Sequence, residues 1–67
     1  MKIFINENEI EIFVGATVES AIRKFDKKIL FEIQKGYSDA CDQYGNHVSL
    51  SGPLHENSQI IIKKISK

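Results

Sequence analysis

The spacing of hydrophobic residues changes once along this chain, and that change constrains the fold more than any other feature. Apolar and polar residues alternate over residues 1–6 and again over residues 9–14, which is typical of half-buried strands. After Gly15 the spacing becomes that of an amphipathic helix. The apolar stripe of this helix consists of Val18, Ala21, Ile22 and Phe25. The chain therefore combines strands with helix, as α+β proteins do.

The two alternating segments are separated by Asn6-Glu7-Asn8, which favours a tight turn and hence an antiparallel hairpin. Alternation divides its side chains between two faces. We expect one face to pack on the core, through Met1, Ile3, Ile5, Ile10, Ile12 and Val14. The other face carries Lys2, Phe4, Glu9, Glu11 and Phe13.

Thr17 is a suitable N-cap for the helix that begins at Val18. The sequence leaves two alternatives open for residues 26–36. Ile29 and Ile33 fit a continuation of the same helix, whereas a kink near Asp26 would start a second short one.

The second half of the chain predicts further strands. Residues 37–42 and 47–50 are compatible with a short pair, joined by a turn at Gly45-Asn46. Residues 59–65 predict the last strand. Its centre, Ile60-Ile61-Ile62, is apolar on both faces, which indicates an interior strand.

The predicted order is β-β-α-β-β, the order of the ubiquitin-like β-grasp: a mixed sheet of four to five strands with one main helix on one face. Residues 1–67 would form a single domain. A strand ending in Asn6, followed by the helix entry Val14-Gly15-Ala16-Thr17-Val18, resembles the start of the small sulfur-carrier proteins of thiamine and molybdopterin biosynthesis. Their second half is similar to Asp42-x-x-Gly45-Asn46-x-Val48-x-Leu50, Leu54 and Asn57-x-x-Ile60-x-Ile62, with Asn57 in place of the usual glycine.

The resemblance implies a β-grasp fold and a carrier that is activated at a C-terminal Gly-Gly. This sequence departs from the family there, because it ends Lys64-Ile65-Ser66-Lys67 and its last glycine is Gly52. We therefore expect a diverged member that keeps the fold and a binding role. A sulfur carrier or protein modifier in cofactor biosynthesis is the alternative.

Composition excludes several functions. Nine Lys and Arg balance nine Asp and Glu, so net charge gives no general attraction to nucleic acid, although Lys63, Lys64 and Lys67 close the chain. We expect no membrane segment, because the apolar runs are short. The single cysteine favours a cytoplasmic setting. A chain of 67 residues leaves no room for a deep enclosed pocket.

Candidate chemical groups are few. Cys41 could act as a nucleophile, but Asp39 and Asp42 beside it disfavour a thiolate, so a packed strand residue is the preferred interpretation. His47 and His55 lack the close ligand spacing of zinc sites and are expected on the surface. We expect no enzymatic activity, no metal and no cofactor.

Apolar residues on the face away from the helix are the main functional signal. We expect Phe4, Phe13 and Ile61 to project from this uncovered face and Ile65 to extend the row. Such a patch indicates an interface with a protein partner or a second copy of the chain. The alternative is that Phe4 and Phe13 form a cross-strand pair that only stabilises the sheet.

Overall fold

The computed structural model describes residues 1–65, so Lys67 lies outside the described residues. Four strands and two helices follow the order β-β-α-α-β-β. Their bounds are β1 Lys2–Ile5, β2 Asn8–Glu11, α1 Val18–Phe25, α2 Lys27–Lys35, β3 Ser38–Cys41 and β4 Gln59–Lys64. The α+β class predicted from the sequence is confirmed.

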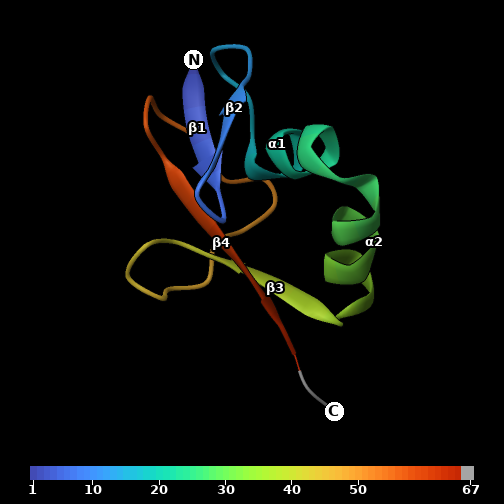
Figure 1. Cartoon of the computed structure of the whole chain (residues 1–67). Helices are drawn as coiled ribbons and strands as arrows, with labels where there is room; N and C mark the ends of the chain where they lie inside the picture. The colour runs from blue at the N-terminus through green and yellow to red at the C-terminus, as the bar shows by residue number, and fades with distance from the viewer. Residues whose placement is uncertain (66–67) are drawn as a thin grey trace.

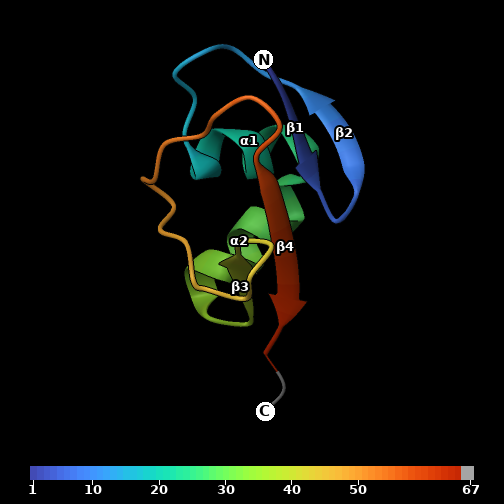
Figure 2. The ribbon, with the colours of Figure 1, turned by 90° about the vertical axis from the view of Figure 1, so that its left-hand side faces the viewer.

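The four strands form one mixed sheet in the order β2-β1-β4-β3. The central strands β1 and β4 run parallel, and each pairs with its outer neighbour in the antiparallel sense. The last strand is thus interior, as its apolar centre predicted. Both helices lie on one side of the sheet (Figure 1), and Figure 2 looks onto the opposite side.

The turn of the first hairpin also fastens the two central strands together. Asn6 and Glu7 both have positive φ angles, 48° and 71°, which suits a two-residue hairpin turn. The side-chain Oδ1 of Asn6 accepts a hydrogen bond from the backbone N–H of Ile62 at 2.9 Å. One side chain therefore joins the turn after β1 to the middle of β4.

Asp26 separates the two helices, which decides between the alternatives for residues 26–36. Its backbone N–H donates to the carbonyl of Ile22 and completes α1, while its carboxylate accepts from the N–H of Lys28 and caps α2. Its φ of −166° is extended, so the helix cannot run through it. A second helix of nine residues accompanies the one main helix that was expected.

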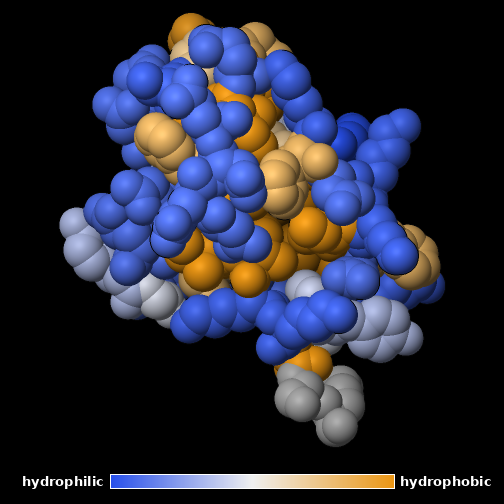
Figure 3. Space-filling view, in the orientation of Figure 1, coloured by the Kyte–Doolittle hydropathy of each residue, from blue (hydrophilic) through white to orange (hydrophobic). Residues whose placement is uncertain are grey.

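The core lies between the sheet and the helices. Its least exposed large side chains come from β1 and α1: Ile3, Ile5 and Ile22. Around it lie half-buried hydrophobic residues, Met1, Ile10, Phe25, Ile29, Ile33, Val48, Leu50 and Ile62. Figure 3 shows hydrophobic side chains reaching the surface between the sheet and the helices, so the core is incompletely covered on this side.

The expectation that Val14 packs in the core is wrong. Val14, expected in the core, is 82% exposed. Strand β2 ends at Glu11, so alternation no longer decides which face a residue takes beyond that point.

Residues 47–50 do not form a strand. His47 makes one bridge to Cys41, and the chain then leaves the sheet. The carbonyls of Leu50 and Gly52 accept hydrogen bonds from the first free N–H groups of α1, at Glu19 and Val18. This segment therefore completes a helix end instead of a strand pair.

Candidate functional site

The side of the sheet opposite the helices, called the open face below, is mostly polar with a small apolar centre. By strand alternation it carries Lys2, Phe4, Glu9, Glu11, Asp39, Cys41, Gln59, Ile61 and Lys63. Phe4 pairs with Gln59, two residues before Ile61 on the same face of β4. Both Phe4 and Ile61 are half-buried. The structure therefore brings together two of the four residues predicted to form the interface.

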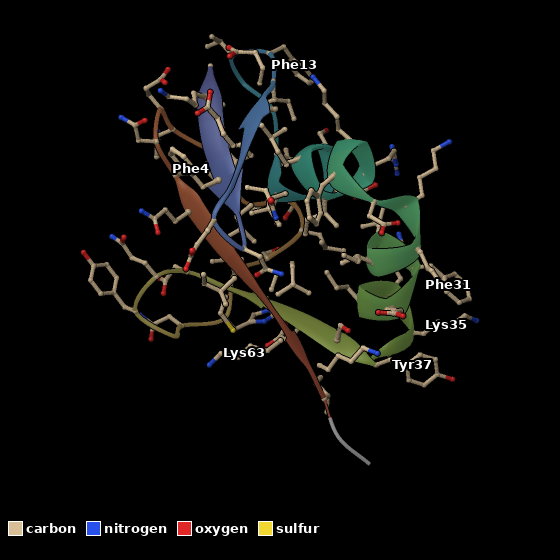
Figure 4. All side chains as sticks on the ribbon, in the orientation of Figure 1. Phe4, Phe13, Phe31, Lys35, Tyr37 and Lys63 are labelled. Carbon is tan, nitrogen blue, oxygen red and sulfur yellow. The ribbon has the colours of Figure 1, made fainter. Side chains whose placement is uncertain are left out.

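The other two predicted residues lie beyond the ends of their strands. Phe13 is 64% exposed, but it follows the end of β2, and Figure 4 shows it apart from Phe4. The predicted cross-strand pair of Phe4 and Phe13 is wrong, because the two-residue turn places Glu9 opposite Phe4. Ile65 follows β4 and is separated from Ile61 by Lys63, so it only extends the row at its far end.

Charged residues surround the apolar centre. Exposed glutamates of the hairpin, Glu7 and Glu9, lie on one side of Phe4. A shallow hollow of about 220 Å³ is lined by Phe4, Glu7 and Gln59. Across the sheet, Lys63 of β4 lies opposite Asp39 of β3 in the strand register. An apolar centre with a charged rim resembles the arrangement of protein interfaces on a small scale.

A larger groove lies where β3 and β4 separate. It has a volume of about 410 Å³, and residues from the loop after β3, from α1 and from the start of β4 line it. The lining includes Asp42, Tyr44, Val48, Leu54, Gln59 and Ile60. Sequence reasoning missed this groove, because it depends on where the pairing of two strands stops. The only sequence signal is the long segment without alternation before Gln59.

Cys41, Asp39 and His47 lie close together at the edge of the open face. The Cys41 thiol donates to the carboxylate of Asp39 at 3.9 Å, and His47 Nδ1 lies 2.7 Å from the other oxygen of the same carboxylate. An activated thiol needs its base at the sulfur, but here the carboxylate lies between thiol and imidazole. Cys41 is buried, as its preferred interpretation predicted.

The histidines are exposed, as expected, and they do not converge on a common ligand position. His47 bonds Asp39, whereas His55 lies in the loop before β4. Among residues 1–65 no group of three His, Cys, Asp or Glu side chains is arranged to hold a metal ion.

A second exposed cluster, on and just after α2, was not predicted. Phe31 and Tyr37 are more than half exposed, and Lys35 Nζ lies 5.4 Å from the centre of the Phe31 ring. Figure 4 shows these three side chains on the far side of the helices from Phe4. The sequence signal was the group Ile29, Leu30, Phe31 and Ile33, which is more hydrophobic residues than one helix face can bury.

The turn beside the groove contains a carboxylate with a perturbed pKa. Asp42 Oδ1 accepts backbone hydrogen bonds from Tyr44 and Asn46, both at 2.9 Å. The bond from the Asn46 backbone contributes most to lowering the pKa of Asp42, because it stabilises the ionised form.

This shift predicts a pH dependence of stability. Because the folded pKa is depressed, ionised Asp42 stabilises the fold above its ordinary pKa, about 4, and that contribution is lost as pH falls through the folded value. Asp42→Asn keeps an oxygen acceptor but no longer ionises. We expect the difference in unfolding free energy between the two proteins to shrink below about pH 4. Urea denaturation at a series of pH values measures it, and a constant difference would contradict the assignment.

No protein-family model, no curated protein and no solved structure matches the chain. Neither helix within residues 1–65 is long and apolar enough to cross a membrane.

Proposed function

We propose that this chain is a non-enzymatic ubiquitin-like β-grasp module that binds another protein through its open face. The observation that carries the proposal is the placement of Phe4 and Ile61 on the side of the sheet without helices. The fold assignment is supported by the parallel pairing of the first and last strands at the centre of a mixed sheet.

The chemistry of the open face favours a protein as its ligand. Phe4 and Ile61 offer apolar area without a cavity deep enough to enclose a small molecule, and the hollow beside Phe4 is shallow. The charges around them, Glu9 on one side and Lys63 on the other, would orient a partner and exclude others. A second copy of the chain is one partner that the same chemistry admits.

The test replaces the apolar centre and measures binding. A photo-crosslinking residue at Glu9, on the open face, would capture the partner in the host cell, and the purified partner would then be titrated. Because buried aromatic and aliphatic residues at an interface centre contribute most, Phe4→Ser with Ile61→Ser should weaken binding about thirtyfold. The matched control is Phe31→Ser, because Phe31 is an exposed phenylalanine on α2, away from the open face. This substitution should change the affinity little.

Two outcomes would reject the proposal. In the first, the crosslinking residue at Glu9 captures no protein, and the chain sediments as a monomer even at high concentration. The other is equal binding by the double variant and the Phe31→Ser control.

The sulfur carrier or modifier is the second candidate. It is favoured by the course of β4, which pairs with β3 as far as Lys64 and ends at the margin of the molecule, where a carrier would present its chain end to an enzyme (Figure 1). Against it, residues 64–67 are Lys-Ile-Ser-Lys and contain no Gly-Gly. Intact-mass spectrometry of protein from its own host would reveal a thiocarboxylate or a conjugate, and an unmodified mass would eliminate this candidate.

A further inference from the structure

The pairing of β3 with β4 ends at Cys41 and Ile61, which leaves the first two residues of β4, Gln59 and Ile60, without a partner on β3. The N–H of Ile65 donates to the carbonyl of Tyr37, and hydrogen-bonded pairs then alternate along the two strands. Continuing this register would place Gln43 opposite Gln59. Instead the chain turns away at Asp42, whose N–H donates to the carbonyl of Asn46.

The backbone of Gln59 consequently has no strand partner on the side of β4 that faces β3. Its neighbours face β1, because the carbonyls of Ser58 and Ile60 accept from the N–H groups of Phe4 and Asn6. Gln59, between them, directs its own N–H and C=O toward the place that β3 leaves empty. Within residues 1–65 no residue outside the strands forms a backbone hydrogen bond with either group.

The groove of about 410 Å³ occupies that empty place. Val48, Leu54 and Ile60 contribute apolar lining, and exposed Tyr44 lies at its rim. Asp42 is the single charged residue among the lining residues of the described chain. The groove thus combines a free strand edge, an apolar pocket and a negative charge.

We propose that this groove binds an extended peptide segment of a partner protein, which adds a short strand to β4 at Gln59. Two backbone hydrogen bonds to Gln59 would align the segment. An aliphatic side chain would enter the space between Val48 and Leu54, and a lysine or arginine would approach Asp42. This site adjoins the open face at Gln59 but differs from it, because it uses the loop after β3 and the backbone of Gln59, whereas Phe4 and Ile61 do not line the groove.

The identity of the occupant follows from these features. A backbone donor and acceptor on one residue match an extended chain, which presents the same pair at every second residue. The charge of Asp42 favours a basic segment over an acidic one. A small organic molecule would use the apolar lining without needing the N–H of Gln59.

The test uses phage-displayed random octapeptides selected on the full chain. The selected peptides should share a basic residue near an aliphatic one. A synthetic copy of a selected peptide would then be titrated by calorimetry into the parent chain and into two variants at Gln59. Gln59→Pro removes the N–H that faces the groove and leaves the bonds to β1 in place, so binding should fall about tenfold. Gln59→Ala keeps the N–H and should bind as the parent does.

Ser49 is exposed and lines the groove, so Ser49→Arg gives an independent check. The arginine would fill the groove with a bulky cation, and we expect it to abolish binding. Circular dichroism of each variant confirms that the sheet is intact. The proposal is overturned if selection yields no peptide, if the peptides are acidic, or if Gln59→Pro and Ser49→Arg bind as well as Gln59→Ala. Loss of binding in the Phe4→Ser variant instead would place the peptide on the open face.

Discussion

Replacing Ile22 by alanine should leave much of the protein unfolded at room temperature. Ile22 lies on α1, is 0% exposed and belongs to the same cluster as Ile3 and Ile5 of β1. Removing so buried a side chain costs about 2–5 kcal/mol, through lost burial and the cavity left behind. Domains of this size have about 3–5 kcal/mol of stability in total. The unfolding free energy, measured by urea denaturation with circular dichroism, should therefore fall close to zero.

Ile29→Ala is the matched control for this substitution. Ile29 lies on α2 and is only half-buried at the margin of the same core, so its truncation removes fewer contacts and leaves a site open to water. We expect it to cost less than half as much. An equal or larger loss at Ile29 would show that the core is centred under α2 instead of α1.

Asn6→Ala should lower the unfolding free energy by about 2 kcal/mol, a large effect for an exposed turn residue. Alanine loses the hydrogen bond that Asn6 accepts from the Ile62 N–H. It also adopts the positive φ of 48° less readily than asparagine does. Both effects act on the junction between the hairpin and β4. The same denaturation experiment measures the sum.

Two further substitutions separate these contributions. Asn6→Gly keeps the backbone freedom but has no acceptor, so it should recover part of the loss. Asn6→Asp keeps an acceptor and should recover most of it. If glycine and alanine were equally destabilising, the backbone conformation would contribute nothing, and that part of the explanation would be wrong.

The fold was predictable where local patterns decide it. Alternation located β1 and β2, and the stripe through Val18 and Ile22 located α1, because each pattern reports which side of an element is buried. Asp26 was recognised as a possible break, but whether a helix continues depends on tertiary packing. The predictions for Val14 and for residues 47–50 were wrong, because they extended the alternating pattern past the point where strand pairing ends.

The candidate site was predictable only in part, for a related reason. Phe4 and Ile61 were placed on one face by alternation within strands that do form. Phe13 lies outside a strand, so its position follows the path of the loop. The groove beside Gln59 depends on the register between β3 and β4, and a sequence does not state which pairs form or where pairing stops.

The parallel pairing of β1 with β4 also governs how the chain folds. Phe4 pairs with Gln59 near the other end of the chain, so the central contact of the sheet requires closure of a very long loop. The hairpin and both helices can form early from neighbouring residues, but none of them completes the core alone. We infer a folding rate limited by the arrival of β4, slower than that of helical bundles of equal length. A chain cut before Gln59 would keep local structure and lose cooperative unfolding.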